Sequence, residues 1–258
     1  MLCKGGDLMA EHRSHNLEQR ILAIIPARAG SKRLPGKNSK LLFNKPLIQW
    51  TIEAAKQCQY LTDILVSTDS EAIAKIAENC ALPVPFMRPA AYAGDKSAAI
   101  DVIEHAITYL NSVGKYYDYI LWLQPTSPLR TLADIDGAIE TLIAKKADAV
   151  ISVCECDHSP LWSNTLDADA SMDNFLPEFV KNNPRSQALP DYFRLNGAVY
   201  IAKTDKLLQE KSFFLNENVF AYKMAKESSI DIDSPLDFKL AELLLADRCS
   251  QSLELDKR

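Results

Sequence analysis

The stretch that decides the fold spans residues 21–38 and reads ILAIIPARAGSKRLPGKN. Its first five residues are all apolar, a run that is long enough for a buried strand and too short for most helices. The rest is a loop that contains glycine and proline and carries four cations: Arg28, Lys32, Arg33 and Lys37. A buried strand that ends in such a loop is suited to hold a polyanion, because backbone N–H groups approach through the glycines while the cations neutralise phosphate charge. The residue types therefore predict a nucleotide site.

This loop matches neither of the common phosphate-binding motifs. It lacks the Gly-Lys-Ser/Thr ending of a P-loop and the G-x-G-x-x-G of a dinucleotide fold. The simpler alternative is a solvated basic turn after a core strand. We favour a nucleotide site because so many cations among glycines exceed what solubility requires.

Composition describes an ordinary globular protein. The chain has 258 residues, of which 47% are hydrophobic and 24% charged, and its net charge of −5 argues against general nucleic-acid binding. No run approaches the ~20 apolar residues of a membrane span. Six cysteines without metal-ligand spacing indicate reduced thiols and a cytoplasmic location. They are Cys3, Cys58, Cys80, Cys154, Cys156 and Cys249.

Strand and helix patterns alternate along the chain, which is typical of an α/β fold with a mostly parallel sheet. The expected strands are residues 21–25, 63–70, 84–87, 119–123, 149–153 and 197–202. The first expected helix begins at Pro46. Further helices are expected at residues 71–80, 97–110, 134–145 and 237–246.

Ligands of such folds bind outside the carboxyl ends of the strands. The cationic loop, Asp69, Arg88 and Gln124 would all gather at that edge. Gln124 opens the loop QPTSPLR at residues 124–130, in which two prolines forbid a regular element and present the polar side chains from a fixed position.

The alternation of strand and helix patterns stops in one internal segment. Residues 154–192 are rich in Pro, Asn, Asp and Ser, and a structureless stretch of this length inside a compact domain is unusual. We expect an arm or dimerisation subdomain there, a nucleotidyltransferase domain at 21–153 and 193–248, and a disordered tail at 1–20.

The second chemical signal is SIDIDSP at residues 229–235. In an extended segment Asp231 and Asp233 face the same way, since side chains alternate with period two. Such a pair suits Mg²⁺, which prefers oxygen ligands and bridges to substrate phosphates. The alternative is that Asp233 or Ser234 only caps a helix that begins near Pro235.

Five blocks of sequence together resemble the acylneuraminate cytidylyltransferase family, the CMP-sialic acid synthetases and their relatives acting on legionaminic or pseudaminic acid. The blocks are residues 24–38, 66–69, 124–130, 194–200 and 229–233, within a resemblance that covers 21–246. It implies transfer of CMP from CTP to the anomeric 2-hydroxyl of a nine-carbon keto-sugar acid, with Mg²⁺ and release of pyrophosphate, for surface glycan synthesis. It also implies a homodimer and a three-layer fold, a mostly parallel twisted sheet with helices on both faces, as in nucleotide-diphospho-sugar transferases.

The resemblance also assigns residues. Arg28, Lys37 and Asp233 would be catalytic, and Asp231 and Asp233 would bind the metal. CTP would be bound by Arg28, Ser31, Lys32, Lys37, Asn38, Arg88 and Ser97. The sugar would be bound by Gln124, Arg185, Asn196, Tyr200, Phe213 and Phe214.

Two departures from the family pattern concern these assignments. Residues 94–99, GDKSAA, have lost most of the hydroxyls that relatives carry after their Arg-Pro pair. The arginine that relatives place in the arm for the sugar carboxylate falls on Ser186, so Arg185 is its expected substitute. No histidine lies in a matching block, which leaves Asp233 and a metal-bound hydroxyl as alternatives for the base.

Three alternatives remain open. The octulosonate cytidylyltransferases carry a similar RLPGK run, but Asn38 and the pair of aspartates favour the nine-carbon branch. A pseudaminate enzyme is a second alternative. HSPLW at residues 158–162 is more similar to the legionaminic-type relatives than to the N-acetylneuraminate enzymes. A catalytically silent nucleotide-binding scaffold would belong to a different class, and it would lose the aspartates that this chain keeps.

Overall fold

The computed structural model describes residues 19–94, 97–182 and 189–255. Its centre is a six-stranded sheet in the order β4-β1-β5-β7-β6-β8, and all neighbours are parallel except β7, which runs antiparallel to β5 and β6. The strands are β1 Ile21–Pro26, β4 Asp63–Ser67, β5 Tyr119–Trp122, β6 Ala149–Glu155, β7 Phe193–Lys203 and β8 Val219–Lys223. A small hairpin of β2 Leu41–Leu42 and β3 Lys45–Pro46 lies outside the sheet.

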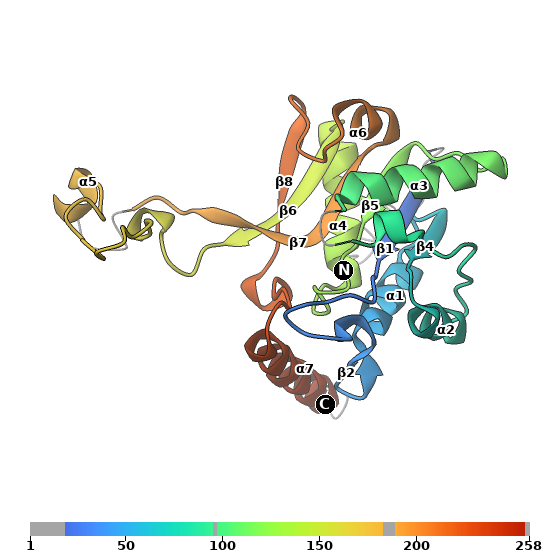
Figure 1. Ribbon diagram of the computed structural model, residues 1–258, viewed down its shortest axis with the longest axis horizontal. Helices are drawn as coiled ribbons and strands as arrows, with labels where there is room; N and C mark the ends of the chain where they lie inside the picture. Colours follow the sequence, from blue (N-terminus) through green and yellow to red (C-terminus); the bar gives the residue numbers. More distant parts are fainter. Residues whose placement is uncertain (1–18, 95–96, 183–188, 256–258) are drawn as a thin grey trace, which may run out of the picture.

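Helices cover both faces of the sheet (Figure 1). They are α1 Leu47–Gln57, α2 Glu71–Asn79, α3 Ala99–Ser112, α4 Leu132–Lys145, α5 Glu178–Asn182, α6 Thr204–Glu210 and α7 Pro235–Leu255. Along β1, Ala23 and Ile25 pack in a core with α1, α2 and α4, whereas Leu22 and Ile24 pack in a core with α3 and α6. This alternation is what a strand buried on both faces requires. The predicted three-layer fold is confirmed.

One expected strand does not form. Residues 84–87 lie in a loop, because Pro83 and Pro85 have no N–H to donate to a ladder. The loop is instead tied to the end of β4 through the bond from Arg88 N to Thr68 O, at 2.7 Å. Conversely, β8 and α6 form where the sequence pattern predicted no element.

Beyond their paired ends, β6 and β7 lead into a segment that projects far from the sheet and carries α5 at its tip (Figure 1). This projection coincides with the segment expected to form an arm. None of the helices in the described ranges is long and apolar enough to cross a membrane. The predicted tail lies outside the described residues apart from Gln19 and Arg20.

Candidate active site

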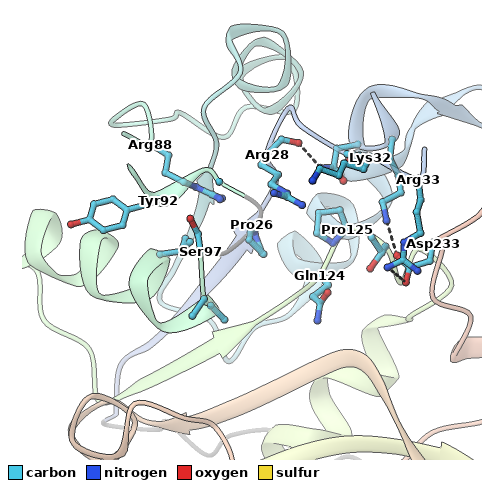
Figure 2. Close-up of a pocket in the computed structure, with 18 of the residues that line it drawn as sticks. Pro26, Arg28, Lys32, Arg33, Arg88, Tyr92, Ser97, Gln124, Pro125 and Asp233 are labelled. Atoms are coloured by element: carbon cyan, nitrogen blue, oxygen red, sulfur yellow. Dashed lines mark hydrogen bonds and ion pairs between the residues drawn. The ribbon is translucent and has the colours of Figure 1, made fainter. Parts of the chain in front are cut away.

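A cavity of about 590 Å³ lies at the carboxyl ends of β1 and β5 (Figure 2). It brings together predicted site residues from five separate segments of the sequence. Those among its lining are Arg28, Ser31, Lys32, Lys37, Asn38, Arg88, Ser97, Gln124 and Asp233. The cationic loop is therefore the wall of a pocket and not a free basic turn.

The backbone of the cationic loop is fixed at both ends. Ala29 N donates to Asp69 Oδ1 at 2.8 Å, so Asp69 supports the loop from the end of β4. The buried Asn38 donates its Nδ2 to Arg28 O at 3.1 Å, which closes the loop on itself. Gly36, at φ 65°, supplies the left-handed turn just before Lys37.

Lys37 joins this loop to the segment at residues 229–233. Its Nζ donates to Ile232 O at 2.6 Å and lies 3.2 Å from Asp233 Oδ1. Arg33 approaches the other oxygen, Asp233 Oδ2, at 3.2 Å (Figure 2). Ile232 N also donates to Thr126 O at 2.8 Å, so the aspartate segment is bonded to the loop at residues 124–130 as well.

The two aspartates are electrostatically coupled. Burial raises the pKa of Asp231, the charge of Asp233 raises it further, and contacts with Thr126 and Lys37 oppose the shift. Asp233 lines the cavity, while Asp231 is half-buried beside Thr126. The charge of Asp233 disfavours the charged form of Asp231, and a hard cation would offset this repulsion, so the residues present fit Mg²⁺.

The cap of α7 is formed by Ser234, one of the two residues that the capping alternative named, and not by the side chain of Asp233. Asp237 Oδ2 accepts from Ser234 N at 2.7 Å and from Asp233 N at 3.1 Å, and Asp237 N donates to Ser234 Oγ at 3.3 Å. Ser234 and Asp237 therefore cap α7. The carboxylate of Asp233 remains turned toward the cationic loop.

Arg88 lies on the wall of the cavity opposite Asp233, and Ser67 at the end of β4 holds its guanidinium. Its Nε donates to Ser67 Oγ at 3.0 Å and its Nη2 to Ser67 O. Burial lowers the pKa of Arg88 to about 10, the carboxylate of Asp69 opposes this, and Arg28 adds to it. The guanidinium is thus a fixed cation at neutral pH. Ser97 contributes a hydroxyl on the same side, with its Oγ 3.4 Å from Ala91 O.

A second cavity, of about 210 Å³, adjoins the first and has a more apolar wall. Tyr200 lies there with its ring centroid 5.9 Å from those of both Phe213 and Phe214. Gln124 and Trp122 line both cavities, so they form the boundary between them. Three aromatic residues that the resemblance assigned to the sugar therefore share one pocket beside the cationic cavity.

Two residues assigned to the sugar are not placed there. Asn196 is 2% exposed, and its carboxamide is used internally: Oδ1 accepts from Ser152 Oγ at 2.5 Å and Nδ2 donates to Ser229 Oγ at 2.9 Å. It lines neither cavity, because a bulge in β7 turns it into the core. Arg185 lies outside the described residues.

Several residues of the lining were missed by the sequence analysis. Tyr92 and Trp122 line the main cavity although no motif contains them. Thr126 is also there, and its place within the block at residues 124–130 was a signal that could have found it.

The sequence model of one protein family, described as Cytidylyltransferase, matches residues 22–253. The chain belongs to this family. It is 37% identical, over 226 residues, to the CMP-N,N'-diacetyllegionaminic acid synthase of Legionella pneumophila, covering 88% of this chain and 96% of that protein. It is 36% identical, over 240 residues, to the N-acylneuraminate cytidylyltransferase of Escherichia coli, covering 93% of this chain but 55% of that protein.

A solved structure has the same fold. It is a CMP:2-keto-3-deoxy-manno-octonic acid synthetase in complex with CTP, with a TM-score of 0.65 and 18% identity over 89% of this chain and all of that one. At this identity the likeness concerns the fold alone. The cytidylyltransferase sequences thus confirm the resemblance to the acylneuraminate branch.

Proposed function

We propose that this cytidylyltransferase moves CMP from CTP to the anomeric 2-hydroxyl of a nine-carbon keto-sugar acid and releases pyrophosphate. The observation that carries the proposal is the pair of adjoining cavities. One is lined by the cationic loop and Asp233, the other by Tyr200 and two phenylalanines, and Gln124 lies between them. A triphosphate suits the first and the carbon skeleton of a sugar the second.

The residues of the first cavity match the demands of the reaction. Attack of the sugar oxygen on the α-phosphorus forms one P–O bond and breaks the bond to the β-phosphate, so negative charge grows on the leaving pyrophosphate. Arg28, Lys32 and Lys37 line the cavity as cations fixed by the loop. Preorganised charges of this kind are usually the largest single contribution to catalysis.

Asp231 and Asp233 would hold Mg²⁺. When bound, the ion would supply further neutralisation of phosphate charge. Asp233 is the sole carboxylate among the described residues of the main cavity, so we assign the proton of the attacking hydroxyl to it. Histidine is a poorer candidate for the base. The ring centroids of His105 and Phe86 lie 4.8 Å apart, and His158 packs against Trp162 in the arm.

We also propose a cytoplasmic homodimer that binds no nucleic acid. The free cysteines Cys58, Cys80, Cys154 and Cys156 agree with a reducing compartment. The exposed apolar side chains of the projecting arm, among them Leu166, Met172 and Phe179, agree with burial against a second copy.

The experiment is CTP-dependent pyrophosphate release, with and without Mg²⁺, tested on a panel of keto-sugar acids. The panel contains N,N'-diacetyllegionaminate, N-acetylneuraminate, pseudaminate and the eight-carbon octulosonate. We expect turnover with a nine-carbon acid, and the N,N'-diacetyllegionaminate relative makes that acid the preferred one. Turnover only with octulosonate would contradict the nine-carbon assignment. CTP binding with no pyrophosphate release from any acid would indicate a silent scaffold.

A further inference from the structure

Arg130 is a buried cation at the end of the loop that starts with Gln124. Its side chain is 3% exposed, and its Nη1 donates to Ala198 O at 2.7 Å and to Gln124 O at 3.3 Å. Within the part of the chain that the structure describes, its Nε and Nη2 have no hydrogen-bond partner. Burying a partly satisfied guanidinium is costly, so an apolar side chain would serve packing better. The charge therefore calls for an explanation other than stability.

The position of Arg130 in the sheet supplies one. The ladder between β5 and β7 ends at the pair Trp122 and Tyr200. Continued by two residues, the same register would place Gln124 opposite Ala198. In the structure, Nη1 of Arg130 lies between these two residues and donates to both of their carbonyl oxygens. The guanidinium thus bridges the strands at the point where their direct pairing stops.

At the same point the side chain of Gln124 lies close to Gly197 of β7. Gly197 has φ +69°, and a Cβ atom added to it would lie 3.2 Å from Gln124 Nε2. The carboxamide of Gln124 therefore rests on the backbone of Gly197, and Arg130 fixes both sides of this contact. It holds the carbonyl of Gln124 itself and that of the residue after Gly197.

We propose that Arg130 is a positioning residue for the sugar acid. By setting the separation of β5 and β7 it holds the carboxamide of Gln124 at the boundary between the two cavities, where the sugar meets the nucleotide. This inference rests on the proposed function, because it takes the cavity beside Tyr200 as the sugar site. Burial lowers the pKa of Arg130 to about 9 while Asp134 opposes the shift, so the group stays charged at neutral pH.

The test compares Arg130→Met and Arg130→Lys in steady-state kinetics with both substrates and in thermal unfolding. For Arg130→Met we expect the KM of the sugar acid to rise about tenfold or more, because small displacements of a positioning group are costly, while the KM of CTP changes less than about twofold. Arg130→Lys retains a cation that can reach one carbonyl and should recover part of the loss. Equal rises in both KM values, or a lower Tm with both KM values unchanged, would overturn the proposal.

A matched control is Arg248→Met. Arg248 on α7 donates its Nη1 to Leu129 O at 2.8 Å, so its loss removes a guanidinium from the same loop without touching Gln124 or Ala198. We expect it to lower Tm while the KM of the sugar acid stays within about twofold, as for a purely structural contact. A sugar KM that rises as much as in Arg130→Met would overturn a specific role for Arg130.

A second measurement covers the case in which Arg130→Met does not fold. If Arg130 acts through Gln124, the effects of Arg130→Lys and Gln124→Ala on the sugar KM should be far from additive. Additive effects would overturn the proposal. Failure of the proposed function itself is visible earlier, as a wild-type protein that turns over none of the sugar acids.

Discussion

Lys37 is the residue at which the cationic loop and the aspartate segment meet. Its side chain is 12% exposed and serves both Ile232 O and Asp233, so it is held before any substrate arrives. A charge held in place needs little reorganisation when the transition state forms, which is why such groups contribute strongly to catalysis.

The first prediction follows from this placement. Lys37→Ala should lower kcat about 10²- to 10³-fold, the range found when one preorganised donor is removed. Lys40→Ala, three residues further on and exposed, is the matched control and should leave kcat within about twofold. The measurement is pyrophosphate release at saturating CTP and sugar acid. Near-normal turnover of Lys37→Ala would show that the loop has been assigned wrongly.

At the scale of single residues, the sequence predicts those site residues whose motif carries an unusual charge. Arg28, Lys37 and Asp233 belong to motifs with more charge than a surface turn needs, and the structure gathers them in one cavity. Asn196 belongs to a matching block too, yet its amide is turned inward by the bulge in β7. A bulge shifts side chains between faces without leaving a clear mark in the sequence.

Among the elements, the contact between α4 and β8 leaves no room for a side chain. A Cβ atom added to Gly137 would lie 2.5 Å from the hydroxyl oxygen of Tyr222 and 2.7 Å from its Cζ. The absence of a side chain at Gly137 thus lets the outermost strand approach the helix.

Gly137→Ala should therefore destabilise the fold although alanine is the better helix former. We expect a loss of about 1–3 kcal/mol in the free energy of unfolding, the range for overpacking, measured by urea denaturation. Adding Tyr222→Ala should recover part of this loss, since it removes the clashing ring. Gly30→Ala is the control, because its Cβ would meet nothing within 4 Å. A Gly137→Ala protein as stable as the wild type would contradict this account.

A different element contact predicts a dependence on pH. Asp63, at the start of β4, accepts from Tyr117 at 2.6 Å and from Lys115 at 3.1 Å. Burial alone would raise the pKa of Asp63, but these hydrogen bonds and the charges of Lys115 and Arg20 lower it overall. The folded state thus favours the charged carboxylate, and this stability is present above the ordinary aspartate pKa and lost as pH falls through the lowered value.

Asp63→Asn should then cost about 1 kcal/mol at pH 7, a figure kept small because the site is partly exposed. The difference from wild type should shrink as pH falls below about 4, the usual range for aspartate. Urea denaturation between pH 3 and 7 measures it, with Asp247→Asn as an exposed control. A difference that stays constant over this range would refute the ionic origin.

Elements with a clear apolar period could be predicted from the sequence, and others could not. The run that forms β1 and the helical spacing of α3 and α4 identify these elements by themselves. The strand expected at residues 84–87 was wrong because two prolines outweigh its apolar side chains. The strand β8 was missed although its sequence, VFAYK, starts with four apolar residues, and the structure places it largely exposed at the edge of the sheet.

In the whole molecule, the arm is the part that the domain core does not explain. It projects beyond the sheet, and α5 at its tip buries Val180 but leaves Phe179 54% exposed (Figure 1). The sequence indicated this segment only by its composition. The second copy that we propose as its partner was inferred from the resemblance alone.

The last prediction tests the proposed homodimer. We expect a dimeric mass by size-exclusion chromatography with light scattering at micromolar concentration, because a stable interface buries about 1,200 Å² or more and the arm presents several apolar side chains for it. Phe179→Asp places a charge in that interface and should shift the mass toward the monomer. Leu236→Asp, at an exposed position of α7 away from the arm, is the control and should remain dimeric. A wild type of monomeric mass, or a Phe179→Asp protein that stays fully dimeric, would show that the arm does not join two copies.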